Sequence, residues 1–211
     1  MLWYSADNGP EGNDKAPGRT NGLRGRKRSL YEGGIRVPGI VTWPAKVKAG
    51  QVTDCPGVTS DYLPTILDVL DFLPPRKFPP DGVSLLPILE GRLDWKRPQP
   101  ILFESAGQTA AIDNRFKLVR HRTGHRKNQK KGAGKVVTEL FDLPADPRET
   151  TNVAAHHPRV LEKLSAKLKA WQVSCQASAA AMVQSPGSCK AEGLPLWESM
   201  SEVILTPSSR I

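Results

Sequence analysis

The sequence predicts an α/β protein whose first part carries strands and a helix and whose second part is a small antiparallel α+β unit. Two observations lead to this expectation. Short apolar runs with strand character precede an amphipathic helical pattern in the first 97 residues. After Pro98, short strand patterns separated by turn signals precede one long helical pattern. We therefore divide the chain into 1–97, 98–173 with a closing helix, and a disordered tail over 174–211.

The first part is expected to contain two buried strands and one helix. Residues 2–6 are apolar, show no helical period and run directly into a turn. The run 35–43 is β-branched and apolar, although Pro38 within it is typical of an edge or irregular position. Residues 60–72 predict a helix with a proline in the first turn, where the missing N–H costs little. Its predicted apolar face consists of Leu63, Ile66, Leu67 and Leu70.

The second part is expected to begin after a short helix at 84–90. Residues 100–105 predict a strand, and Asp113-Asn114-Arg115 predicts the turn of a hairpin. Residues 136–141 predict a further strand that ends at a turn-rich PADP sequence. The closing helix is predicted to begin at His157-Pro158. Its apolar face repeats at i, i+3 and i+4 and consists of Val160, Leu161, Leu164, Leu168 and Trp171.

Charge and composition narrow the classes of partner. A net charge of +9 favours an anionic partner, such as nucleic acid, a sulfated sugar or a membrane surface, with a solvated basic surface as the alternative. The basic segment Arg120 to Lys135 fits a sulfated polysaccharide or a solvated loop. It lacks the interleaved aromatic residues that stack on nucleic-acid bases, so no nucleic acid is expected. No apolar run is long enough to predict a membrane span, and no signal peptide is visible.

The three cysteines do not indicate a metal site or a disulfide framework. Cys55, Cys175 and Cys189 are too few and odd in number for a framework, and none has zinc-ligand spacing. A single bridge between the last two stays open.

Asp7 and Asn8 are candidate metal ligands. They follow the first predicted strand, and ligands in open α/β sheets bind outside the carboxyl ends of strands. Both side chains present oxygen, the atom that hard cations such as calcium or magnesium require. Gly9 and Pro10 permit the turn that would bring both side chains to one ion. Turn chemistry is the alternative, because Asp-Asn and Asn-Gly are common turn sequences.

A glycine-rich basic segment follows, from Gly22 to Pro38. It places Arg24, Arg26, Lys27 and Arg28 near one another, and a lysine is a compact source of positive charge for a tetrahedral oxyanion. A solvated basic loop is the alternative.

Together these segments resemble the sulfatase family. The matching letters are Asp7-Asn8-Gly9-Pro10-Glu11, then Gly25, Lys27, Tyr31-Glu32-Gly33-Gly34 and Arg36-Val37-Pro38. Looser matches are TSDYLPTILDVL, DGVSLLPIL, PILFES and ELFDLPADPRETTNVA, so the resemblance covers residues 1 to about 173. The YEGGIRVP block together with the upstream DNG carries most of it.

The resemblance implies a fold, a reaction and roles for particular residues. The fold would be alkaline-phosphatase-like, with residues 1–97 as the C-terminal part of the large sheet domain and 98–173 as the small antiparallel subdomain. The activity would be hydrolysis of sulfate esters of sugars or aryl groups with calcium as cofactor. By position, Asp7 and Asn8 would be metal ligands and Lys27 a sulfate contact. Arg24, Arg26 and Arg28 are weaker candidates for substrate binding.

Two departures from the family pattern lead to a further expectation. The family's formylglycine nucleophile lies in a Cys/Ser-x-Pro/Ala-x-Arg motif, and its remaining calcium ligands include an Asp-Asp pair; neither occurs here. The chain is therefore expected to be a C-terminal portion that begins within the sheet, with an incomplete calcium shell and no activity alone. Export to the periplasm or outside the cell is expected from the resemblance. The alternatives are a non-catalytic module that binds anionic polymers and a phosphoester hydrolase of the same superfamily.

Overall fold

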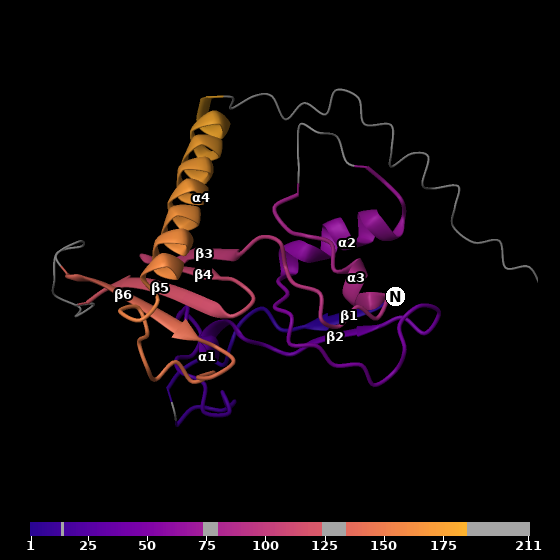
Figure 1. Cartoon of the computed structure of the whole chain (residues 1–211), viewed down its shortest axis with the longest axis horizontal. Coiled ribbons are helices and arrows are strands. Elements are labelled where there is room, and N and C mark those ends of the chain that lie inside the picture. The colour runs from indigo at the N-terminus through magenta and orange to yellow at the C-terminus, as the bar shows by residue number, and fades with distance from the viewer. Residues whose placement is uncertain (14, 74–79, 124–133, 185–211) are drawn as a thin grey trace, which may run out of the picture. The chain divides into compact units, whose positions relative to one another are not determined.

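The computed structural model describes residues 1–13, 15–73, 80–123 and 134–184 (Figure 1). The chain divides into two compact units, residues 1–171 and 172–211, and the fold that follows is that of the first. The predicted boundary between residues 97 and 98 falls inside the first unit and stays a prediction. Within the described residues, no helix is long and apolar enough to cross a membrane.

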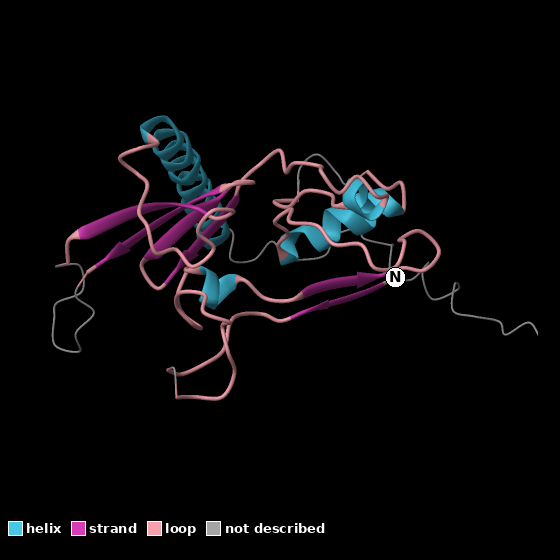
Figure 2. Ribbon diagram, turned by 60° about the horizontal axis from the view of Figure 1, so that its bottom comes forward, coloured by secondary structure: helices cyan, strands magenta, loops and turns pink. Residues whose placement is uncertain are grey.

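A two-stranded antiparallel sheet forms at the start of the chain. Strand β1 (Leu2–Ser5) pairs with β2 (Gly39–Thr42), so that Trp3 lies opposite Val41 and Tyr4 opposite Ile40. Both strands occur where they were predicted, but the prediction that they are buried is wrong. Within the described residues the sheet has two strands, and the helices α2 (Tyr62–Val69) and α3 (Leu86–Leu89) lie on one side of it (Figure 2). The predicted second strand also begins later, because Ile35 is the last residue of helix α1 (Glu32–Ile35) and residues 36–38 link that helix to β2.

The helical segment that follows packs through its small and polar residues. It comprises a 3-10 turn η1 (Thr59–Asp61), helix α2 (Tyr62–Val69) and the short helix α3 (Leu86–Leu89). Pro64 and Thr65 are buried, whereas Leu63 and Leu70 of the predicted apolar face are exposed. The helix was therefore predicted correctly and its buried side wrongly. The Thr65 hydroxyl explains the difference, because it donates to the Asp61 carbonyl and accepts from the Leu85 amide.

A four-stranded antiparallel meander forms the second sheet, with strand order β3-β4-β5-β6. Its strands are Ile101–Ser105, Gln108–Ile112, Phe116–Arg122 and Val136–Asp142. The predicted hairpin turn joins β4 to β5, and the Asp113 carboxylate stabilises it by accepting the amides of Arg115 and Phe116 at 2.8 and 2.6 Å. The strand predictions in this part of the chain are confirmed.

The meander is covered on both faces. Helix α4 (Pro158–Gln184) packs one side through Leu164 and Leu168, against Leu118 and Leu140. The segment ahead of α1 packs the other side, where Leu30 and Tyr31 contact Ala110, Val119 and Phe141. The sheet thus fixes the glycine-rich segment in place. Residues 174–184 belong to α4, where the sequence predicts a tail, and the rest of that tail lies outside the described residues.

Candidate functional site

The predicted metal ligands lie in a bend directly after β1. The Asp7 side chain is exposed, Asn8 is half-buried and Gly9 is buried. The Asn8 side-chain amide donates to the Gly9 carbonyl at 3.0 Å, which leaves its Oδ1 oxygen as an acceptor. Among the described residues, Asp7 forms no ion pair. The bend therefore contains a side-chain-to-backbone hydrogen bond that is typical of turns. This hydrogen bond leaves the Asp7 carboxylate and the Asn8 Oδ1 oxygen available as ligands.

The bend packs directly on the glycine-rich segment. The Gly9 amide donates to the Gly34 carbonyl at 2.8 Å, and the Gly33 amide donates to the Arg24 carbonyl at 2.7 Å. A Cβ atom at Gly9 would overlap the Gly33 carbonyl, and one at Gly34 would overlap the Ser29 carbonyl. Only glycine allows backbones to approach this closely. The structure therefore brings together the two segments that the sequence singles out.

Lys27 lies beside the same bend and faces an acidic neighbour. Its amide donates to the Pro10 carbonyl at 3.1 Å, and its ammonium lies 3.5 Å from the Glu11 carboxylate. Arg28 also pairs with Glu11. The Arg28 guanidinium, with a smaller contribution from Lys27, holds the pKa of Glu11 below its ordinary value. Lys27 and Arg28 are both exposed, so their pairing with Glu11 is a solvent-screened contact.

Arg24 and Arg26 make contacts that organise the protein. The Arg26 guanidinium donates to the backbone carbonyls of Glu11, Pro17 and Gly18 at 3.0 to 3.2 Å. Arg24 stacks over the Tyr31 ring, 3.8 Å from its centroid, and also pairs with Glu139 at 3.3 Å. These contacts favour a structural role for both arginines over contact with a substrate.

Sequence reasoning missed a buried charge cluster behind the glycine-rich segment. The Lys117 ammonium lies 2.8 Å from both the Glu32 and the Glu149 carboxylates, and all three side chains are almost fully buried. Glu149 also accepts the Glu32 amide at 2.6 Å. Burial raises the pKa of Glu149 above its ordinary value, although Lys117 opposes the shift. A signal was present, because Lys117 interrupts the apolar run Phe116 to Val119 that follows the predicted hairpin turn.

A second cluster holds Tyr31 against the meander. The Tyr31 hydroxyl donates to the Glu139 carboxylate and lies 3.1 Å from the His121 ring nitrogen Nε2. Burial and the adjacent carboxylate raise the pKa of Tyr31. Burial alone would raise the pKa of Glu139, but the Tyr31 hydroxyl and the Arg24 guanidinium lower it below its ordinary value. Both clusters anchor the glycine-rich segment at consecutive residues.

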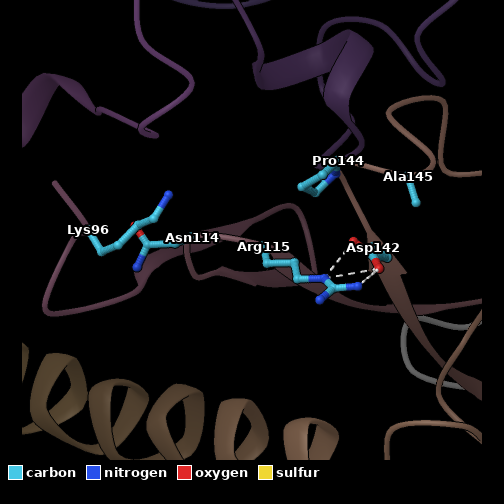
Figure 3. Close-up of a pocket in the computed structure, with 6 residues that line it drawn as sticks. All are labelled: Lys96, Asn114, Arg115, Asp142, Pro144 and Ala145. Atoms are coloured by element: carbon cyan, nitrogen blue, oxygen red, sulfur yellow. Dashed lines mark hydrogen bonds and ion pairs between the residues drawn. The ribbon is translucent and has the colours of Figure 1, made fainter. Parts of the chain in front are cut away.

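Two shallow hollows lie on the meander side of the first unit. One, of about 560 Å³, is lined by Lys96, Asn114, Arg115, Asp142, Pro144 and Ala145. Figure 3 shows the Arg115 guanidinium extending to Asp142, with their closest atoms 2.6 Å apart. The other, of about 570 Å³, includes Arg24 among its lining residues. Neither hollow is lined by Asp7, Asn8 or Lys27.

The metal-ligating capacity of the bend is partial. Among the described residues, no three or more histidine, cysteine, aspartate or glutamate side chains form a group that could hold a metal ion. Asp7 and Asn8 contribute two oxygen donors, which suit a hard cation, and calcium takes six to eight. These oxygen donors are of the type that calcium binds, but they supply only part of its coordination shell.

Comparisons with known proteins show which family has this architecture. The family model described as N-sulphoglucosamine sulphohydrolase, C-terminal, matches residues 25–174. A solved structure from a study of the metabolism of multiple glycosaminoglycans by Bacteroides thetaiotaomicron is similar over 82% of this chain and 38% of its own, with a TM-score of 0.66 and 28% identity. The fold is thus the C-terminal portion of an alkaline-phosphatase-like hydrolase. More narrowly, the chain belongs to the sulfatase family.

Curated relatives agree with this assignment. The N-acetylgalactosamine-6-O-sulfatase of Bacteroides thetaiotaomicron is 32% identical over 80% of this chain and 35% of its own length. Human arylsulfatase A is 33% identical over 78% of this chain and 31% of its own. The chain therefore spans about a third of the length of these two relatives.

Proposed function

We propose that this chain supplies the C-terminal part of a sulfate ester hydrolase. The observation that carries the proposal is the packing of Gly9 on the Gly33-Gly34 backbone. This contact brings two oxygen donors, at Asp7 and Asn8, into the same loop cluster as the Lys27 ammonium. A sulfate ester is an anion whose leaving oxygen gains negative charge during hydrolysis, so positive charge placed in advance stabilises the transition state.

The roles of the individual residues follow from their surroundings. Asp7 and Asn8 would hold the divalent cation through their side-chain oxygens, and the bound cation would supply electrostatic stabilisation of the sulfate oxygens. Lys27 would exchange its exposed contact with Glu11 for a contact with the sulfate. Arg28 is the best supported of the three predicted substrate arginines, because its only charged partner in the described residues is the exposed Glu11 carboxylate.

The substrate class is a sulfated sugar. Support comes from the bacterial relative, whose name specifies an N-acetylgalactosamine 6-O-sulfate as its substrate, and from the excess of basic residues in this chain. A net charge of +9 raises the local concentration of a polyanionic substrate. An aryl sulfate is the alternative suggested by human arylsulfatase A.

We further propose that the chain has no turnover alone. Its sequence holds no Cys/Ser-x-Pro/Ala-x-Arg motif, and two oxygen donors are too few to retain calcium. Incubating the pure chain with an aryl sulfate and calcium should release no sulfate. Release of sulfate would overturn this part of the proposal.

A chimera tests the function itself. This chain replaces the matched C-terminal portion of the Bacteroides N-acetylgalactosamine-6-O-sulfatase, and release of sulfate from a 6-O-sulfated substrate is measured. An active chimera is expected, and Lys27→Ala within it should lower kcat by about 10²- to 10³-fold. Lys46→Ala is the matched control, because Lys46 is exposed and distant in sequence from the bend, and it should leave kcat unchanged. A folded but inactive chimera would contradict the proposal.

A further inference from the structure

The second of the two hollows on the meander side contains an arginine that pairs with no described carboxylate. This hollow has a volume of about 570 Å³, which lies in the range of small-molecule binding sites. Its lining residues are Gly22, Arg24, Glu139, Arg148, Glu149 and Thr150. Arg148 is exposed and forms no ion pair with any residue that the structure describes. We call this site the Arg148 hollow.

The loop after β6 holds Arg148 at the surface of the hollow. The next residue, Glu149, has a φ of 57°, in the left-handed region that residues other than glycine rarely adopt. The Asp146 carboxylate fixes this bend by accepting the Thr150 amide at 2.7 Å and the Thr150 hydroxyl at 3.1 Å. The Glu149 carboxylate is buried and pairs with Lys117 at 2.8 Å. The bend therefore directs Glu149 inward and leaves Arg148 outside.

The Arg148 guanidinium packs against the backbone of the glycine-rich segment. A Cβ atom at Gly22 would lie 3.3 Å from both Cζ and Nε of Arg148, which is tighter than ordinary contact. Gly22 also has a φ of 82°, a conformation that favours glycine. Contact with this backbone restricts the orientations of the arginine. An arginine ordered in this way loses less conformational entropy on binding a ligand than a free surface arginine does.

The two carboxylates that line the hollow already have cationic partners. Glu139 pairs with Arg24 at 3.3 Å, and Glu149 pairs with the buried Lys117. Arg24 also donates to the Glu149 carbonyl at 3.0 Å, which ties the two walls of the hollow together. Arg148 is thus the lining charge that the described residues leave uncompensated. A guanidinium offers a planar fork of N–H donors that matches the oxygens of a sulfate or a carboxylate.

We propose that the Arg148 hollow binds a second oxyanion group, a sulfate or a carboxylate, of an oligosaccharide substrate. The inference rests on the proposed function, because it extends the sulfated-sugar substrate from a single unit to a chain. The hollow and the Lys27 ammonium both belong to the glycine-rich segment, which contributes Gly22 and Arg24 to the hollow. Lys27 contacts the sulfate to be hydrolysed, and Arg148 donates to an anionic group on another unit of the same sugar chain. Two points of attachment raise the affinity for the oligosaccharide above that for a single sulfated sugar.

A binding experiment without turnover tests this proposal. The full chain, labelled with ¹⁵N, is titrated with a tetrasaccharide of alternating 6-O-sulfated N-acetylgalactosamine and uronic acid units, and the arginine Nε–H resonances are followed by NMR. The Arg148 resonance, identified by its loss in Arg148→Ala, should shift as the sugar binds. Arg148→Ala should raise Kd about tenfold, the loss expected for a charge-assisted hydrogen-bonded contact. Arg148→Lys keeps the charge without the planar fork, so its Kd should lie between the two.

Arg159→Ala is the matched control. Arg159 is exposed on α4 and forms no ion pair with a described residue, so its removal changes the net charge by the same amount. Its resonance should not shift, and its loss should raise Kd by less than about twofold, since a solvated charge outside the hollow contributes little. The desulfated tetrasaccharide, which keeps its carboxylates, separates the two sources of the oxyanion. An equal dependence on Arg148 assigns a carboxylate to the hollow, and a lost dependence assigns a sulfate.

Two outcomes would overturn the proposal. They are an Arg148 resonance that does not shift and an equal rise in Kd for Arg148→Ala and Arg159→Ala, because binding would then come from the net charge alone. Circular dichroism verifies that both variants remain folded. An inactive chimera together with Arg148-dependent binding would contradict the proposed function and leave the Arg148 hollow as a site for sugar anions. An active chimera with binding that does not depend on Arg148 would contradict this inference alone.

Discussion

Lys117 on β5 and Glu32 on α1 form a buried ion pair of 2.8 Å although 85 residues separate them in the sequence. Glu149 completes the cluster at the same distance from the Lys117 ammonium. The two carboxylates belong to segments on either side of the meander in the sequence. Their shared lysine joins the glycine-rich segment, the central strand and the loop that follows β6 into one structural unit.

Lys117→Met should destabilise the chain strongly. Removing the cation leaves two carboxylates buried without a partner, and breaking a buried ion pair this way costs about 3–5 kcal/mol. Urea denaturation monitored by circular dichroism measures the free energy of unfolding. The double variant Lys117→Met/Glu149→Gln should be more stable than the single variant, since one unpaired charge is gone. A single-variant loss below about 1 kcal/mol would contradict a stabilising role for the cluster.

Gly9→Ala should disrupt the packing of the Asp7-Asn8 bend on the glycine-rich segment. The added methyl group would overlap the Gly33 carbonyl, and overpacking of this kind costs about 1–3 kcal/mol. Gly39→Ala is the matched control, because a Cβ there meets no atom within 4 Å. Thermal unfolding of both variants measures the effect, and equal melting temperatures for the two would show that the close approach is unimportant.

Arg97→Met should unfold the helical segment more readily. The Arg97 guanidinium forms two hydrogen bonds of 2.6 and 2.8 Å with the buried Asp61 carboxylate, which also accepts the amides of Val58 and Val83. Losing the cation should cost about 3–5 kcal/mol, because Asp61 stays buried.

The matched control for this variant is Arg92→Met. Arg92 is 63% exposed and pairs with an exposed glutamate, so its loss should change the free energy of unfolding by less than about 1 kcal/mol. Hydrogen exchange of the α2 amides locates the effect. Unaltered protection of α2 in Arg97→Met would contradict this assignment.

Protonation of Glu139 should make the chain less stable in acid. The Tyr31 hydroxyl and Arg24 outweigh burial and hold its pKa in the folded state below the ordinary value of 4.5. Ionised Glu139 therefore contributes stability above pH 4.5, and this contribution is lost as the pH falls through the lowered pKa. The stability gap between the unchanged chain and Glu139→Gln should narrow over that range.

Denaturation at a series of pH values from 7 to 3 measures that gap. Glu90→Gln is the control, since Glu90 is half-exposed and pairs with the exposed Arg92. A gap for Glu139→Gln that does not vary with pH would contradict the proposed hydrogen bond.

The pH dependence of stability that Glu149 causes should have the opposite sign. Burial raises the pKa of Glu149, so its contribution to stability is lost as the pH rises through that raised pKa.

Local patterns predicted the elements well because turns and periodicity are encoded within a few residues. The Asp113 turn, the flanking strands and the Leu164–Leu168 face of α4 all follow from such patterns. The predictions that failed concern burial, which depends on packing partners that are distant in the sequence. The burial of Tyr4 and Leu70 was inferred from apolar character alone, which cannot reveal whether another layer covers a residue.

In the candidate site, too, local features were predicted from the sequence and contacts between distant residues were not. The Asp7-Asn8 and Lys27 segments were singled out from their residue types, and the structure places them in contact through Gly9 and Pro10. The buried Lys117 cluster escaped prediction because its three members lie far apart in the sequence, so the lysine within an apolar run did not reveal which carboxylates pair with it. The roles of Asp7, Asn8 and Lys27 in binding stay predictions.

The order of pairing in the two sheets has a consequence for how the chain assembles as it is synthesised. The meander pairs each strand with its neighbour in sequence, which favours rapid local folding. The glycine-rich segment leaves the ribosome early, but its buried partners lie on β4, β5 and β6 and in the loop after β6. Its docking must therefore wait for the second half of the chain, and the exposed apolar residues before it are those that a chaperone would shield in the interval.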